Sequence, residues 1–76
     1  MKQNNYFTFG QQYRDGNHPK YPLAHKDGWV NIVADDHMKA REKAFELFEP
    51  HFACSYTDEN WDHRYFPLGE IERIEI

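Results

Sequence analysis

Cysteine is almost absent from this chain, because its 76 residues include only Cys54. A single cysteine excludes an internal disulfide, so a fold stapled by disulfide bonds is ruled out. The lone thiol, with no apolar run after Met1 that resembles an export signal, predicts a cytoplasmic protein. No run of apolar residues approaches the roughly eighteen that a membrane-spanning helix needs, so we expect no membrane insertion.

Motifs of catalysis and phosphate binding are missing as well. The four glycines are isolated from one another, so no glycine-rich phosphate loop is present. No nucleophile elbow and no spaced pair of catalytic carboxylates occurs. Asp35, Asp36 and His37 are adjacent, but Asp at the start of a helix is typical of a cap. The sequence therefore predicts no enzyme activity, no catalytic residue and no cofactor.

A basic stripe for nucleic-acid binding is the third absence. The formal net charge is −4, and the C-terminal third holds Arg64 and Arg73 against seven carboxylates. Replacement of phosphate counterions requires clustered Lys and Arg, so we expect no direct contact with nucleic acid. The acidic third would suit a basic protein partner, although such charge is also typical of an ordinary solvated surface.

Aromatic residues are what the chain has in abundance, with six Phe, five Tyr and two Trp. A chain of this length forms one domain, spanning residues 1–76, and buries only roughly 60% of the surface that its unfolded form exposes. Large rings bury much area for little side-chain entropy, so we expect them to dominate a small core.

Hydrophobic periodicity predicts one amphipathic helix from about Asp35 to Glu49, capped by Asp35 or Asp36 and ended by Pro50. Its charged residues share one side, while Ala44, Phe45 and Phe48 lie on the side that we expect to cover the sheet. Arg41 alone falls within this apolar arc. It either extends along the rings to reach water or pairs with a carboxylate.

Short runs rich in aromatic and β-branched residues predict the strands. These runs are Tyr6–Phe9, Trp29–Val33, Phe52–Tyr56, Arg64–Leu68 and a short strand within Glu70–Ile76. A polar loop occupies about residues 11–28. The order favours an α+β fold: a single small antiparallel or mixed β-sheet of about three to five strands, with one amphipathic helix packed on one face. Phe7, Phe9, Val30 and Ile32 are expected to face that helix.

Two regions are predicted to bind a partner, because aromatic residues rimmed by charge are typical of protein interfaces. The first region is the polar loop, with Tyr13, Arg14, His18 and Tyr21. The second is the segment from residue 58 to residue 66, with Asp58, Glu59, Trp61 and Asp62. For Trp61, packing into the core is an equally good interpretation.

Five histidines raise the hypothesis of a metal-binding protein. None of them has the spacing of a known zinc site, and the combination that the fold would have to assemble is Cys54 with His51 and His63. Surface histidines and a buried thiol account for the same residues. We therefore predict no metal ligands and keep metal binding as an alternative.

Several short motifs of the chain resemble a known set of proteins. These motifs are Tyr6–Gly10, the histidine-containing loop after it, Gly28–Val30, Ala34, Ala40-Arg41, Phe48 and Ala53–Tyr56. They resemble a set of small bacteriophage-encoded proteins to which no activity is assigned, and the likeness covers most of the chain through short motifs. It implies a viral protein made in the cytoplasm of an infected bacterium. Small phage proteins often bind and block host machinery, including CRISPR effectors.

The leading hypothesis is therefore stoichiometric binding to a host protein, such as an anti-CRISPR inhibitor of host defence, by a monomer or a homodimer. The alternative is a small-ligand or nucleotide-binding module. In that alternative Arg14, His18, Lys20 and Tyr21 would line a pocket between subunits.

Overall fold

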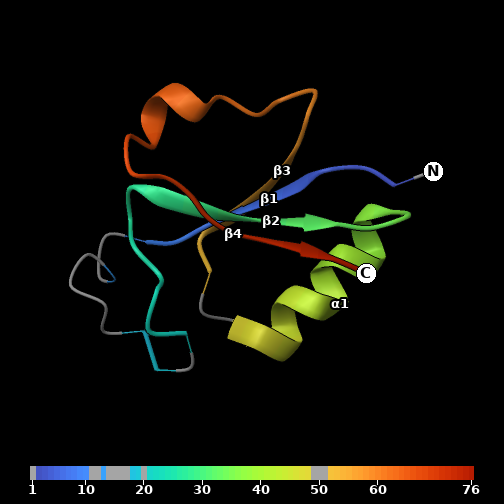
Figure 1. Cartoon of the computed structure of the whole chain (residues 1–76), viewed down its shortest axis with the longest axis horizontal. Coiled ribbons are helices and arrows are strands. Elements are labelled where there is room, and N and C mark those ends of the chain that lie inside the picture. Colours follow the sequence, from blue (N-terminus) through green and yellow to red (C-terminus); the bar gives the residue numbers. More distant parts are fainter. Residues whose placement is uncertain (1, 11–12, 14–17, 20, 49–51) are drawn as a thin grey trace.

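The computed structural model describes residues 2–10, 13, 18–19, 21–48 and 52–76. Its elements are β1 (Asn5–Thr8), β2 (Gly28–Val33), α1 (His37–Phe48), β3 (Cys54–Thr57), a 3-10 helix (His63–Tyr65) and β4 (Gly69–Glu75). They form one four-stranded sheet in the order β3-β1-β2-β4. β1 is antiparallel to β2 and β3, whereas β4 is parallel to β2. The sheet is thus mixed, with α1 on one face (Figure 1), which confirms the predicted fold class.

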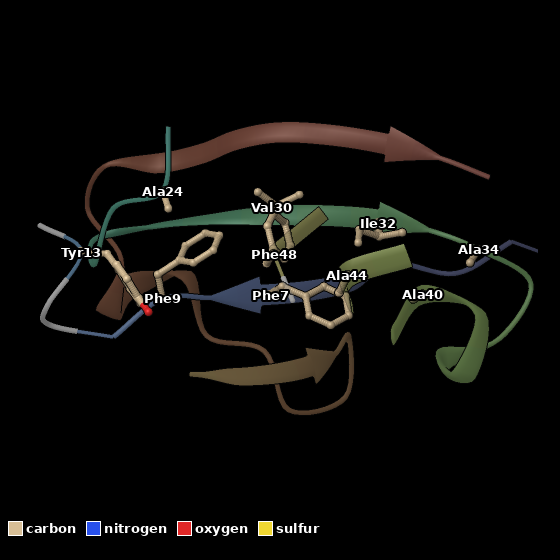
Figure 2. Close-up of a cluster of buried hydrophobic side chains, with 10 residues drawn as sticks. All are labelled: Phe7, Phe9, Tyr13, Ala24, Val30, Ile32, Ala34, Ala40, Ala44 and Phe48. Carbon is tan, nitrogen blue, oxygen red and sulfur yellow. The ribbon is translucent and has the colours of Figure 1, made fainter. Parts of the chain in front are cut away.

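The core lies between α1 and the sheet face that carries the even-numbered residues of β2 (Figure 2). Val30 and Ile32 of β2 are fully buried there, and so is Phe7 of β1. Side chains alternate along a strand, so Val30 and Ile32 share the face towards α1, as expected from the sequence. Asn31 and Val33 on the other face are also buried, so β2 is covered on both sides. The buried cluster comprises Phe7, Phe9, Tyr13, Ala24, Val30, Ile32, Ala34, Ala40, Ala44 and Phe48.

Helix α1 begins where Asp36 provides its cap. The Oδ1 atom of Asp36 accepts a hydrogen bond of 2.8 Å from the backbone N–H of Lys39, which satisfies a donor that the first helical turn leaves free. Two small residues, Ala40 and Ala44, allow the helix backbone to approach the sheet, and Phe48 fills the remaining space with no exposed surface. The helix therefore matches the predicted one to within two residues at its start.

Phe45 departs from the expectation that it would cover the sheet. Its side chain is 45% exposed and meets Phe52 edge-on, with 5.5 Å between ring centroids. The guanidinium carbon of Arg41 lies 5.8 Å from the centroid of the Phe45 ring. Arg41 thus extends along a ring at the edge of the core, the first of its two expected arrangements.

The segment Arg64–Leu68 is not a strand, which corrects the prediction. Its first part belongs to the 3-10 helix, because a side-chain oxygen of Asp62 accepts a 3.0 Å hydrogen bond from the backbone N–H of Arg64 and caps the turn. The chain then reverses at Gly69, whose φ of +93° suits glycine. The short strand expected within Glu70–Ile76 is confirmed as β4, with Ile74 opposite Ile32.

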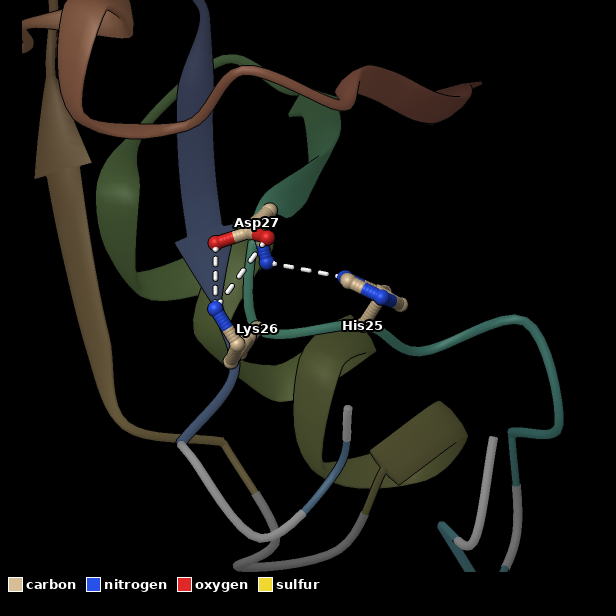
Figure 3. A network of polar contacts seen from close by, with 3 residues as sticks. All are labelled: His25, Lys26 and Asp27. Carbon is tan, nitrogen blue, oxygen red and sulfur yellow. Dashed lines mark hydrogen bonds and ion pairs between the residues drawn. The ribbon is translucent and has the colours of Figure 1, made fainter. Parts of the chain in front are cut away.

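The turn before β2 also anchors the start of β4. Within this turn the backbone N–H of Asp27 donates to Nδ1 of His25 at 3.0 Å, and Lys26 Nζ lies 3.0 Å from the Asp27 carboxylate (Figure 3). The carbonyl of Asp27 accepts a 2.9 Å hydrogen bond from the backbone N–H of Leu68. An ideal Cβ at Gly28 would lie 2.8 Å from the Ile71 side chain, so a larger residue would push β4 away.

Candidate functional site

The sheet face opposite α1 is covered by the segment between β3 and β4 (Figure 1). Trp61 lies at the centre of this cover. Its ring stacks on Tyr6 at 4.6 Å and on Phe66 at 5.2 Å, with interplanar angles of 5° and 14°. It also meets Trp29 at 5.0 Å and Tyr56 at 5.5 Å. We call these five rings, Tyr6, Trp29, Tyr56, Trp61 and Phe66, the aromatic stack.

The aromatic stack holds the turn that follows β3. The hydroxyl of Tyr6 donates to Oδ1 of Asp58 at 2.6 Å. The turn is closed by Asn60, whose Oδ1 accepts from the backbone N–H of Thr57 at 3.0 Å and whose own N–H donates to the Thr57 carbonyl at 3.2 Å. Asp58 and Glu59 are exposed on this turn. We call residues 57–60 the acidic turn.

Two hollows flank the acidic turn. One holds about 360 Å³ and is lined by Gln3, Asn4, Thr57, Asp58 and Glu59. The other holds about 200 Å³ and is lined by Tyr56, Asn60, Trp61, Asp62, Tyr65 and Phe66. An acidic hollow next to an aromatic one suits a long basic side chain, whose methylenes pack on rings while its charged head meets carboxylates.

The acidic turn brings two exposed carboxylates, Asp58 and Glu59, to this face. Arg64 hydrogen-bonds Asp62, with its terminal nitrogen 2.8 Å from Oδ2, and these bonds lower the pKa of Asp62 to about 2. Asp62 is therefore ionised at neutral pH but already compensated by its neighbour. Asp58 and Glu59 are left as the carboxylates that a basic partner would meet first.

The ionisation of Tyr6 should affect the stability of the folded protein at alkaline pH. Burial, followed by the hydrogen bond to Asp58, raises the pKa of Tyr6 to about 12. The unfolded chain would ionise this tyrosine near pH 10, so the folded state retains its proton longer. The stabilisation that Tyr6 provides should thus be fully present below about pH 10, and the free energy of unfolding should fall as the pH rises from 10 towards 12. Denaturant unfolding at several pH values measures this fall.

Tyr6→Phe provides the control for this prediction, because it keeps the stacked ring and removes the proton. The variant should lose stability less steeply than wild type between pH 10 and 12. Tyr21 retains its own steep contribution, since burial and a hydrogen bond to Glu72 also raise its pKa. Identical slopes for Tyr6→Phe and wild type would contradict the assignment.

The first predicted binding region is largely part of the core. Tyr13 is 8% exposed and His18 is 5% exposed, and both rings pack near Phe9. Tyr21 is half-buried, and its hydroxyl donates to Glu72. Arg14 lies outside the described residues. The burial of Tyr13 and His18 leaves little aromatic surface here for a partner or a nucleotide.

The second predicted region is brought together by the structure. Asp58 and Glu59 share the acidic turn, while Trp61 and Asp62 line the aromatic hollow beside it. Trp61 is half-buried: part of its ring packs in the aromatic stack, and part of it lines the hollow. This region is therefore the candidate site.

The described residues contain no cluster of side chains that supports the metal hypothesis. In residues 2–10, 13, 18–19, 21–48 and 52–76, no group of three or more His, Cys, Asp or Glu side chains is placed to hold a metal ion. Cys54 is exposed, so the expectation of a buried thiol is wrong. His63 is also exposed, and His51 lies outside the described residues.

One polar cluster was missed by the sequence analysis. Asn5 is fully buried on β1, and its Oδ1 lies 2.8 Å from Nδ1 of His37, the first residue of α1. Nε2 of His37 lies 3.2 Å from Oγ of Ser55 on β3. An asparagine in a strand and a histidine at the start of a helix are both common, so neither residue predicts the cluster. The one local signal was the amide of Asn5 at the start of an aromatic strand.

No protein-family model, no curated protein and no solved structure matches this chain. In the part of the chain that the structure describes, none of the helices has the length and apolar character to cross a membrane. Function can therefore be inferred only from the residues of the chain itself.

Proposed function

We propose that this protein acts by stoichiometric binding to a host protein, through the acidic turn and the aromatic hollow beside it. The observation that carries the proposal is the placement of Asp58 on a turn that hydrogen bonds fix in one conformation. The hydroxyl of Tyr6 donates to Asp58, and Asn60 accepts from the backbone of Thr57. A preorganised turn loses little conformational freedom on association, so more of the interaction energy appears as affinity. The proposed activity needs neither a cofactor nor a catalytic residue.

The chemistry of this face favours a basic partner surface. Two exposed carboxylates flank an aromatic hollow, and residues 49–76 carry most of the negative charge of the chain. Nucleic-acid channels present such basic surfaces, and an acidic protein can occupy them in place of nucleic acid. With the phage resemblance, this points to a bacterial host-defence effector, such as a CRISPR effector, as the class of partner.

Reversal of charge on the acidic turn is the direct test. The double variant Asp58→Lys/Glu59→Lys should recover its host protein from bacterial lysate at least about tenfold less well than wild type, because like charges then meet across the interface. Capture by wild type should weaken as salt is raised. Pull-down from lysates of several bacteria, followed by affinity measurement with the purified partner, gives both results.

A matched control carries the same change of charge elsewhere. Glu42→Lys/Glu46→Lys alters two exposed carboxylates of α1, on the opposite side of the sheet from the acidic turn. It should bind as wild type does. Equal losses in both double variants would indicate non-specific electrostatics, and failure to recover a specific protein from any host would count against the proposal. Light scattering of the complex gives its stoichiometry and shows whether one or two copies of this chain take part.

A further inference from the structure

Asn5, His37 and Ser55 form a continuous chain of hydrogen bonds between three elements. Oδ1 of Asn5 lies 2.8 Å from His37 Nδ1, and His37 Nε2 lies 3.2 Å from Ser55 Oγ. A hydroxyl, an imidazole and an orienting acceptor in this order match the roles of nucleophile, base and orienting group in acyl-transfer sites.

The orientation of the imidazole follows from the bonds that Asn5 makes. Its Nδ2 donates to the carbonyl of Gln3 at 3.1 Å and to the carbonyl of Ile32 at 2.9 Å. Both amide protons are thus used, which places Oδ1, an acceptor only, against His37 Nδ1. Nδ1 therefore carries a proton, and in the neutral form of the ring the lone pair of Nε2 points at the Ser55 hydroxyl.

Ser55 keeps part of its surface in water, because it is half-buried. It belongs to β3, an edge strand of the sheet whose residues are exposed or half-buried. His37 is half-buried and is the first residue of α1, so the positive end of the helix dipole lies near the site. Negative charge that develops on an oxygen beside Ser55 is stabilised by such a dipole.

We propose that Ser55 is a nucleophile that takes an acyl group from small carboxylic esters, with His37 as its base and Asn5 as a positioning residue. Ser55 Oγ forms a bond to the ester carbonyl carbon while its proton passes to His37 Nε2. The carbon–oxygen bond to the alcohol breaks, and the alcohol leaves with that proton. Water, activated by the same nitrogen, then releases the acid and restores Ser55. This activity is independent of the acidic turn, which lies on the other face of the sheet.

The competing explanation is that the three residues merely tie the start of α1 to the sheet. Both explanations predict the same hydrogen bonds, but they differ in reactivity. A serine that serves only as a hydrogen-bonding partner does not react with a fluorophosphonate, because its hydroxyl keeps its proton. Covalent labelling therefore separates the two.

The test uses the full chain with Cys54→Ala, since an exposed thiol next to Ser55 would otherwise react with acyl donors. Intact mass and peptide mapping after treatment with a fluorophosphonate should place one adduct on Ser55. Treatment with p-nitrophenyl acetate should release p-nitrophenol faster than buffer does. Ser55→Ala should abolish the adduct and this excess release. His37→Gln, which keeps a polar side chain towards Asn5 but is not a base, should slow both at least about tenfold.

Two Asn5 variants test its positioning role. Asn5→Asp keeps an acceptor facing His37 but loses the two donors to the carbonyls of Gln3 and Ile32, so it should be less stable than the parent and yet label faster than Asn5→Ala. Asn5→Ala, which has no acceptor for His37, should label at least about tenfold more slowly than the parent. Near-ultraviolet circular dichroism confirms that each variant is folded at the temperature of the assay. Absence of an adduct on Ser55 in the folded parent, or equal labelling of the parent and His37→Gln, would overturn the proposal.

Discussion

Replacing Phe48 by alanine is expected to lower the free energy of unfolding by about 3–5 kcal/mol. The Phe48 ring has no exposed surface and meets Phe9 at 5.2 Å and Tyr21 at 5.0 Å between centroids. A chain of this length has a total stability of roughly 4–11 kcal/mol, so the loss is a large part of the whole. The melting temperature should fall by at least about 12 °C, or the variant should be unfolded at 25 °C.

Phe45→Ala is the matched control, because it removes the same ring from the same helix at a position that is 45% exposed. It should cost less than about 2 kcal/mol, since roughly half of its surface is in water already. Urea unfolding of both variants, followed by circular dichroism, measures the difference. If Phe48→Ala melted within a few degrees of Phe45→Ala, the orientation of α1 on the sheet would be wrong.

The helix and the central strand were predictable because local physics determines them. A 3.6-residue period, a capping Asp36 and Pro50 after the last turn all act within a few residues of one another. Likewise, successive side chains of β2 point to opposite faces, so Val30 and Ile32 were correctly placed together in the core. In these segments the tertiary structure agrees with the local preferences.

The strand expected over Arg64–Leu68 was wrong, whereas the short strand expected within Glu70–Ile76 is confirmed as β4. Tyr65, Phe66 and Leu68 have the composition of a strand, but the Asp62 cap closes a 3-10 turn over the first of them. β4 instead pairs in parallel with β2, a partner that lies far away in the sequence. Such a pairing leaves no local signal beyond the alternation of Ile74 and Ile76.

The burial of two side chains of the polar loop was not predictable for a related reason. Its turn-forming residues hide the fact that Tyr13 and His18 pack against Phe9, and His18 also meets Phe48 at 6.1 Å. In the same way, Asn5 and His37 are 32 positions apart and His37 and Ser55 are 18 apart. Sites assembled by the fold from such separate residues require the structure itself.

Trp61→Ala is expected to destabilise both the fold and the proposed binding. The ring is held between Tyr6 and Phe66, and its loss exposes a large part of the aromatic stack. Because Trp61 is half-buried, the free energy of unfolding should fall by about 2–4 kcal/mol, somewhat less than for a fully buried tryptophan. Tyr65→Ala, which removes a ring from the same hollow at a position that is 76% exposed, should cost less than about 1 kcal/mol.

Trp61→Ala also tests whether affinity depends on the charge of the acidic turn alone or also on the rings that fix its conformation. Trp61→Ala keeps Asp58 and Glu59, so an interface that depends on charge alone would survive at a temperature where the variant is folded. If the aromatic stack must hold the acidic turn in place, affinity for the purified host protein should fall at least about tenfold, mainly through faster dissociation. Unchanged affinity in the folded variant would show that the acidic turn binds without support from the aromatic stack. Binding would then depend on the carboxylates and not on the rings beneath them.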